Sequence, residues 1–412
     1  MLLTTLLTLF VFSQSTDAQV EFTAGAGVSR QKAALTAGAG LDVTSGKLSL
    51  GISVPVVVLL EKADVSVDKR LWDTPTDYAY AIRYLGFRSR IGSADFGLLL
   101  GETHDVTLGF GGVARHFNPL IHFDSPHSGA QLGFVHKRIR GFFFIDDFVA
   151  PKIGGFSLRG EGPGGLFAGG SLFADPSMPY TMNDPGGTVH VDRDAGTLIP
   201  FSTGRFLPLS VFLGYAFNES FVAAVEGITL DLGDGGALGI MGHLEGTLKG
   251  KTATFSLKIS GGGGGDHFQP FTAGPFYLMQ REFSDSGATS MARALAVSEN
   301  PGYGMALDAG VKLSFSQNKS LEVRGSFSRN RFADVMNGTV TAFISQKMAL
   351  AFFGAVDTQK NGIFSLHGRI ALSPRWFVWT RAKRLFAISA GNDYYEPRLQ
   401  ILAGLGYREN SD

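Results

Sequence analysis

The chain contains no cysteine, which excludes disulfide bonds, thiolate metal sites and cysteine nucleophiles. It also has no formal net charge, because 36 Lys and Arg balance 36 Asp and Glu, so nothing points to nucleic acid as a partner. After residue 18, no apolar run approaches the roughly 18–20 residues that a membrane-spanning helix needs. The longest run, at 52–60, is interrupted by Pro55. A membrane could therefore be crossed only by strands.

Glycine and phenylalanine are abundant, with 55 and 35 residues, and apolar residues recur with a period of two. In the clearest segment, at 303–315, small or polar residues separate the apolar ones, which are Tyr303, Met305, Leu307, Ala309, Val311, Leu313 and Phe315. Successive side chains of a strand point to opposite faces, so this strand has one oily face and one small or polar face. The same rhythm recurs along the chain and predicts a closed antiparallel barrel, apolar outside and polar inside.

Connection lengths support this interpretation. Short turns alternate with long connections, which is the pattern of outer-membrane barrels, where the long loops are extracellular. The pattern predicts an all-β, up-and-down transmembrane barrel of about 18 strands, range 16–20, over residues 19–412. Long extracellular loops are expected near 160–205 and 261–302. The count is least certain between residues 90 and 160, where Phe142, Phe143 and Phe144 break the alternation, and residues 116–160 could form wall or plug.

The first 18 residues predict a signal peptide. An apolar run at 2–12 precedes Thr16, Asp17 and Ala18, and small residues flank the acid where a signal peptidase would cleave, near Ala18. The segment lacks the Lys or Arg that usually precedes the apolar run. The expected location is the bacterial outer membrane after export.

The whole mature chain resembles bacterial outer-membrane β-barrels of the porin-like kind. The resemblance rests on the signal segment, the alternating strands, the turn and strand "ALSPRWFVW" at 371–379, and the final strand "RLQILAGLGYRE" at 398–409. It implies assembly into the bilayer and its outer-membrane lipids by barrel-assembly machinery. One departure is that Tyr407 is followed by five further residues, whereas such barrels usually end on an aromatic residue.

Strand phase predicts a set of charged and polar side chains that face the lumen. Their mixed signs suggest a transverse field and selectivity, although charges in a wide barrel are also often only solvated or paired. Arg324, Arg369 and Arg381 are the first choices for selectivity, because basic wall residues favour anionic solutes. The full set is Arg324, Arg369, Arg381, Lys383, Lys258, Lys312, Asp308, Glu322, Glu245, His243 and His367.

The expected function is a porin-like channel for small hydrophilic solutes, without cofactor or bound metal. No nucleophile motif, zinc-protease motif or phosphate-binding loop occurs, so we do not expect an enzyme. One alternative is the barrel of an envelope export machine, for instance for polysaccharide, with a plugged or gated lumen and periplasmic partners. Another is a soluble exported β-sandwich that binds a ligand. The pattern leaves open the solute, the state of the lumen, and whether the protein is a monomer or a trimer.

Overall fold

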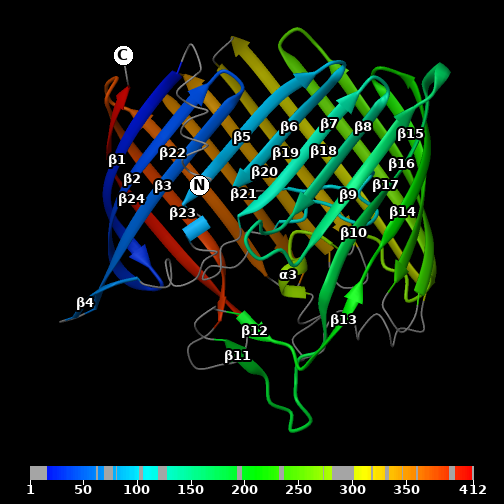
Figure 1. Cartoon of the computed structure of the whole chain (residues 1–412), viewed down its shortest axis with the longest axis horizontal. Helices are drawn as coiled ribbons and strands as arrows, with labels where there is room; N and C mark the ends of the chain where they lie inside the picture. Colours follow the sequence, from blue (N-terminus) through cyan, green and yellow to red (C-terminus); the bar gives the residue numbers. More distant parts are fainter. Residues whose placement is uncertain are drawn as a thin grey trace.

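The chain folds into one closed antiparallel β-barrel of twenty strands. The structure is a computed structural model. It describes residues 16–61, 64–68, 78–79, 81–101, 105–118, 128–192, 197–231, 236–271, 273–280, 301–316, 319–329, 334–345, 347–358, 361–388 and 395–410. Strands slant around a common axis, and the first wall strand pairs with the last to close the cylinder (Figure 1).

Each wall strand pairs with its neighbours in sequence, which makes the topology up-and-down. The wall strands are β1 (Thr16–Ser29), β2 (Lys32–Ser45), β3 (Leu48–Glu61), β5 (Ile82–Ile91), β6 (Ala94–Gly101), β7 (Gly129–His136), β8 (Ile139–Ile145), β9 (Gly154–Glu161), β10 (Leu166–Thr181), β14 (Leu209–Asn218), β15 (Phe221–Asp231), β16 (Gly236–Lys249), β17 (Ala253–Asp266), β18 (Pro301–Ser316), β19 (Lys319–Arg329), β20 (Asp334–Ser345), β21 (Met348–Asp357), β22 (Gly362–Ala371), β23 (Trp376–Ile388) and β24 (Tyr395–Asn410).

Two short strands extend the wall at its lower edge in Figure 1: β4 (Asp64–Val67) continues from β3, and β13 (Ser202–Phe206) pairs with the end of β10. A separate hairpin of β11 (His190–Asp192) and β12 (Thr197–Ile199) projects beyond the same edge. No helix in the described part of the chain has the length and apolarity that crossing a bilayer requires.

The strand count of about 18 was slightly low, and part of the predicted 160–205 loop is wall. A short 3₁₀ helix (Pro163–Gly165) reverses the direction of the chain. β10 then runs back as a strand of the wall, so the long connection covers only residues 182–208. Gly169 and Gly170 made this strand look like a loop. Glycine is needed at position 169 because a Cβ there would lie 2.1 Å from the carbonyl oxygen of Leu158 in the neighbouring strand β9.

The start of the predicted 261–302 loop is also wall. The five glycines at 261–265 lie in β17, which continues to Asp266. Their inner face receives the ring of Phe268, since a Cβ on Gly264 or on Gly239 of β16 would lie within 2.5 Å of that ring. The missing side chains in the glycine run therefore leave room for the aromatic ring to pack against the wall.

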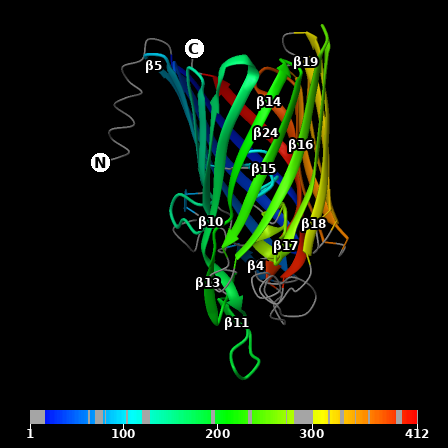
Figure 2. The same cartoon turned by 90° about the vertical axis from the view of Figure 1, so that its right-hand side faces the viewer.

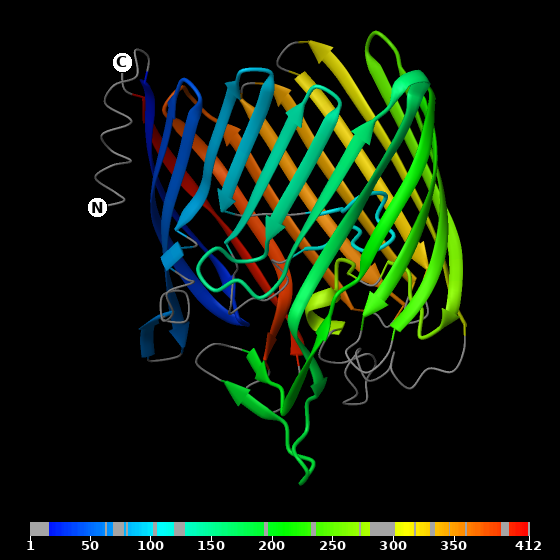
Figure 3. The ribbon, with the colours of Figure 1, turned by 45° about the vertical axis from the view of Figure 1, so that its right-hand side comes forward.

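The two rims of the barrel differ in the length of their connections. One rim, called the short-turn rim here, carries turns of two to four residues together with the start of β1 and the end of β24. The other, called the long-loop rim, carries the connections 62–81, 102–128, 182–208 and 267–300, and it faces downward in Figure 3. The predicted division into short and long connections thus holds for the wall strands.

The outer face of the barrel is apolar, as the alternation predicts. On β16, Leu238, Ile240, Leu244 and Leu248 point outward and are 48–74% exposed. The long strands β14 to β18 run side by side in Figure 2 and carry the same pattern. Exposed apolar side chains over a whole cylinder suit lipid, because water would leave them unfavourably solvated. The single closed barrel excludes the two-sheet sandwich for the described residues.

Aromatic side chains gather at the short-turn rim. One group is Tyr215, Phe217 and Phe221, whose successive ring centroids are 4.9 and 5.3 Å apart. Another is Trp376 with Tyr407, at 5.1 Å. Aromatic rings prefer the boundary between lipid tails and headgroups, so these residues mark one edge of the apolar band.

The signal peptide stays a prediction, because residues 1–15 lie outside the described part of the chain. Cleavage after Ala18 is compatible with the barrel. Residues 16–18 pair only with β2, whereas the pairing of β1 with β24 begins at Gln19 and Asn410.

The orientation of the barrel can be tested with single cysteines, since the chain has none. Pro185→Cys lies in the exposed 185–188 segment beyond the long-loop rim, and Lys251→Cys lies in a turn of the short-turn rim. We expect a membrane-impermeant maleimide to label Pro185→Cys on intact cells and Lys251→Cys only after the outer membrane is permeabilised. The reverse pattern would invert the assigned topology.

Candidate functional site

Two chain segments fold into the barrel and pair with each other; together we call them the plug. They are residues 105–118, between β6 and β7, and residues 267–271 with 273–280, after β17. Ala114 and Ala273 form a parallel bridge, and the Phe271 amide donates to the Gly112 carbonyl over 2.9 Å. The second segment ends in the short helix α3 (Tyr277–Gln280), which lies inside the barrel toward the long-loop rim (Figure 3).

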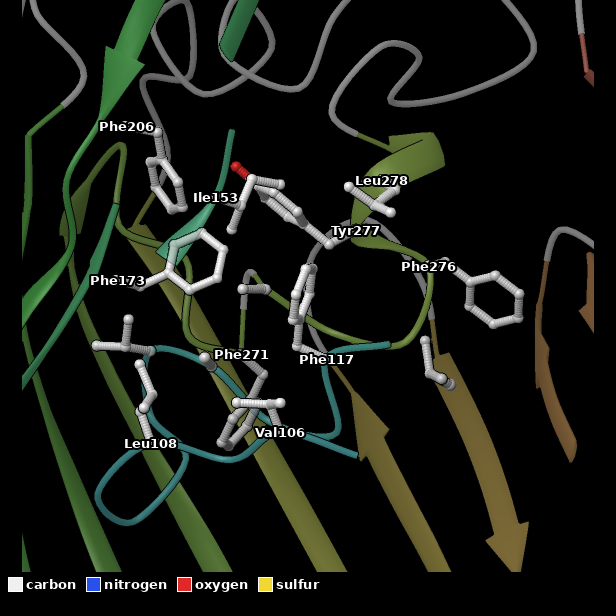
Figure 4. Packing of buried hydrophobic residues seen from close by; sticks show 14 of the residues in the cluster. Val106, Leu108, Phe117, Ile153, Phe173, Phe206, Phe271, Phe276, Tyr277 and Leu278 are labelled. Carbon is white, nitrogen blue, oxygen red and sulfur yellow. The ribbon is translucent and has the colours of Figure 1, made fainter. Parts of the chain in front are cut away.

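An aromatic core fixes the plug to the wall (Figure 4). Phe117 and Tyr277 of the plug pack against Phe173 of β10, with ring centroids 5.3 to 6.0 Å apart. All three side chains are fully buried. The Tyr277 hydroxyl also donates to Asp175 over 3.0 Å. Phe276 reaches Phe386 of β23 at 6.4 Å, so the plug's apolar contacts extend from β10 to β23.

The broken alternation at 142–144 follows from this packing. Phe143 points outward and is 44% exposed, whereas Phe144 is buried in the plug core and Phe142 packs against it. The inner face of β8 is apolar because the plug covers it. The question of wall or plug at 116–160 is thereby answered: residues 129–136, 139–145 and 154–161 are wall, and the plug segment lies earlier, at 105–118.

A buried pair of ionisable side chains lies where the plug meets β15 and β16. His243 Nε2 is 3.0 Å from Glu226 Oε2, and both side chains are fully buried. The Gly112 amide donates to the same carboxylate over 3.2 Å. Phe110 stacks on the His243 ring at 5.1 Å. A Cβ on Gly112 would lie 2.5 Å from the Glu226 carboxylate, so glycine allows this approach.

A second charged cluster joins the plug to β18. The buried Arg115 guanidinium and His116 Nε2 both contact Asp308 Oδ1, the latter at 3.0 Å, and His116 Nδ1 contacts Asp105. Burial alone would lower the pKa of His116, but its hydrogen bonds to Asp105 and Asp308 raise that pKa above its ordinary value. The cluster is therefore strongest when His116 is protonated.

A basic gallery occupies the part of the lumen that is lined by β1–β3, β5 and β20–β24. It is a cavity of about 340 Å³ lined by Arg83, Arg369, Arg381 and Lys383, together with Glu21 and several threonines. Arg369 Nη1 donates to Glu21 over 2.9 Å and its guanidinium stacks on Phe377 at 3.5 Å. No ion pair involves Arg381 among the described residues. Four cationic side chains face this cavity and one carboxylate does, so its wall favours anions.

Two polar contacts lie at the end of the gallery toward the long-loop rim. Gln400 Nε2 donates to Ser29 over 3.0 Å, and Arg30 Nε donates to Asp68 over 2.9 Å. Beside them lies a small apolar cluster of buried inner-face residues, which are Ala34, Val57, Leu59 and Leu402.

The structure places all eleven predicted lumen residues on the inner side of the wall, in four settings. His367, Arg369, Arg381 and Lys383 line the gallery. Glu245, Lys258, Asp308 and Arg324 line a second cavity beneath the plug. Glu322 contacts Arg324 and lies 3.9 Å from Lys312, and His243 is buried against Glu226.

Sequence reasoning missed residues of two kinds. Glu21 and Asp42 follow the strand phase of β1 and β2 and could have been found by it; Asp42 accepts hydrogen bonds from Arg83 and Tyr84. Arg115 and His116 lie in an irregular segment without periodicity, so no phase rule could place them. Among the described residues, no cluster of three acidic or histidine side chains is arranged to hold a metal ion.

The His116 cluster predicts a pH-dependent plug. A group whose pKa is raised on folding stabilises the docked plug below its unfolded value of about 6.5, and this contribution is lost as the pH rises through the folded pKa. If the barrel conducts, as the sequence predicts, channel openings of the wild type should become more frequent as the pH is raised from about 6 to 9, while His116→Gln should show little pH dependence. Open probability in planar bilayers measures this. His136→Gln, at the short-turn rim, is the control and should keep the wild-type profile.

Comparisons with known proteins find the barrel architecture in solved structures. No protein-family description matches the chain, and no curated protein matches its sequence. The outer-membrane protein OmpT of Vibrio cholerae is 10% identical with a TM-score of 0.30, over 96% of this chain and 99% of that one. OccK5 (OpdH) of Pseudomonas aeruginosa is 10% identical with a TM-score of 0.34, over 97% and 99%. A structure titled porin is 8% identical with a TM-score of 0.33, over 96% and 100%. The resemblance to outer-membrane porin-like barrels is thus one of architecture, which the strand register of this chain itself establishes.

Proposed function

We propose that the chain is an outer-membrane channel that passes small hydrophilic solutes, prefers anions, and is gated by its plug. The observation that carries this proposal is the basic gallery: a cavity of about 340 Å³, lined by four cationic side chains, inside a barrel whose outside is apolar. Solutes move along the gallery wall, where Arg369, Arg381 and Lys383 replace part of their hydration, and Glu21 limits how tightly an anion is held.

The short-turn rim supplies a wide vestibule for this path. A groove of about 560 Å³ there is lined by Arg88, Arg90 and Arg140 with Asp95. A Cβ on Gly97 or Gly133, both in this groove, would meet no atom within 4 Å. Basic residues thus line this groove as well as the gallery, and they would attract anionic solutes toward the lumen.

Because the plug occupies part of the bore, the proposed channel needs a gating step in which the plug moves. The plug also supports one alternative function. An aromatic core that reaches from β10 to β23 holds the plug in the bore. In the alternative, the chain is the barrel of an export machine, and a periplasmic partner displaces the plug. The two functions predict different behaviour of the purified protein: a channel opens spontaneously, whereas an export barrel stays closed without its partner.

Weakening the plug should open the channel. Phe117→Ala removes a buried ring from the plug core, which costs about 3–5 kcal/mol of packing. We expect wild-type protein in planar bilayers to show infrequent stepwise openings and Phe117→Ala to stay open for most of the recording. The matched control is Phe143→Ala, whose ring faces lipid. Heat-modifiable gel migration confirms folding of each variant. A wild-type barrel that stays silent, while Phe117→Ala conducts, would favour the export machine.

The gallery should set ion preference. Arg381→Glu together with Lys383→Glu changes the charge of the gallery by four units, so the reversal potential in a salt gradient should shift from anion toward cation preference. Lys251→Glu, in a turn of the short-turn rim, should leave the reversal potential near the wild-type value. An unchanged reversal potential in the double variant would remove the gallery from the conduction path.

A further inference from the structure

A second cavity lies beneath the plug, and β20 contributes residues both to it and to the gallery. It has a volume of about 270 Å³, and its wall comes from β16 to β20. Asp105 and His116 of the plug close one side of it. Its polar lining otherwise consists of Glu245, Lys258, Asp308, Arg324, Ser256, Ser326, Asn337 and Thr339.

Most charges in this cavity already have partners. Asp308 is held by Arg115 and His116, and Asp105 by His116. Arg324 contacts Glu322. These groups are neutralised within the protein, and they form the frame of the cavity rather than its free binding groups.

Lys258 and Glu245 are different. They face each other in register on β17 and β16, yet no ion pair joins them, or joins either to another side chain, in the described part of the chain. The Lys258 ammonium lies 5.2 Å from the centre of the Phe110 ring, which holds it by a cation–π contact without neutralising it. Glu245 is exposed to the lumen. The cavity therefore presents one free positive and one free negative charge from neighbouring strands.

We propose that this cavity binds a small zwitterion of the α-amino acid type, with its carboxylate at Lys258 and its ammonium group at Glu245. The inference rests on the proposed function in one respect, since the solute reaches the cavity through the lumen. The hydroxyl and amide groups of Ser256, Asn337 and Thr339 are available to the polar side chain of the solute.

Charge and size both favour a zwitterion. A plain anion attracted by Lys258 would be repelled by Glu245, and a plain cation attracted by Glu245 would be repelled by Lys258. A solute that carries both charges satisfies the two free groups at once. The volume of about 270 Å³ falls below the 300–1,000 Å³ of pockets for drug-sized ligands and suits a single amino acid.

Direct binding tests the proposal independently of conduction. Isothermal titration calorimetry of the folded full-length barrel in detergent would use L-glutamine as the probe, with two analogues that each lack one charge: 4-carbamoylbutanoate and 4-aminobutanamide. We expect saturable binding of L-glutamine, and affinities lower by about tenfold or more for each analogue, because each leaves one charged group without its partner.

Two variants locate the site. Lys258→Met keeps the length of the side chain and Glu245→Gln keeps its shape; each should weaken L-glutamine binding by about tenfold or more. Lys251→Met, in a turn outside the cavity, should bind as the wild type does. Heat-modifiable migration shows that each variant is folded.

Two results would overturn the site: no saturable heat with L-glutamine in the wild type, or unchanged affinity in both Lys258→Met and Glu245→Gln. Equal affinity for L-glutamine and 4-carbamoylbutanoate would show that the site binds an anion and does not require a zwitterion. A wild-type barrel that binds L-glutamine but does not conduct would contradict the channel and leave the site standing. A barrel that conducts but does not bind would do the opposite.

Discussion

The structure depends on one constraint: within lipid, every backbone N–H and C=O must find a partner inside the protein. A strand with one apolar face meets this requirement only if both of its edges are paired. The register between β1 and β24, from Gln19 with Asn410 to Ser29 with Gln400, pairs the last two edges and turns an open sheet into a cylinder. The apolar outer face and the enclosed lumen both follow from that closure.

Closure creates an interior that either water or chain must fill. The residues on the inner face of the wall differ according to which of the two they contact. Along the gallery wall at β20–β24, inner residues face a cavity, and cationic side chains lie there among apolar ones. Against the plug they are aromatic, as with Phe144 and Phe173, or are glycines that receive a ring, as with Gly264 under Phe268. The inward-facing positions of the wall strands therefore carry one set of residues where they face a cavity and another where they pack against the plug.

This difference decides how much could be predicted. The outer face was predicted well, because lipid imposes a period of two on every wall strand, and the charged inner residues of β16 to β23 followed from the same phase. The strand at 166–181 was missed because its glycines resemble a loop, and their purpose is visible only with the neighbouring strands in place. The plug at 105–118 could not be predicted at all. Irregular backbone has no period, and the partners of Arg115 and His116 are distant in sequence. Only the break in alternation at 142–144 indicated that something apolar lies inside.

Two kinds of interaction hold the plug, and their magnitudes differ. Each buried aromatic side chain contributes about 1.5–3 kcal/mol through the surface removed from water. The buried pairs contribute little net stability, because desolvation offsets their attraction. Arg115 shows this directly: its Nε and Nη1 are buried without a hydrogen-bond partner among the described residues, so hydration on undocking would compensate part of the lost contact with Asp308. The aromatic core therefore holds the plug in place, while the charged groups set its register and make its docking sensitive to pH. The aromatic contacts do not titrate and act at any pH, whereas the contribution of the His116 cluster depends on the pH.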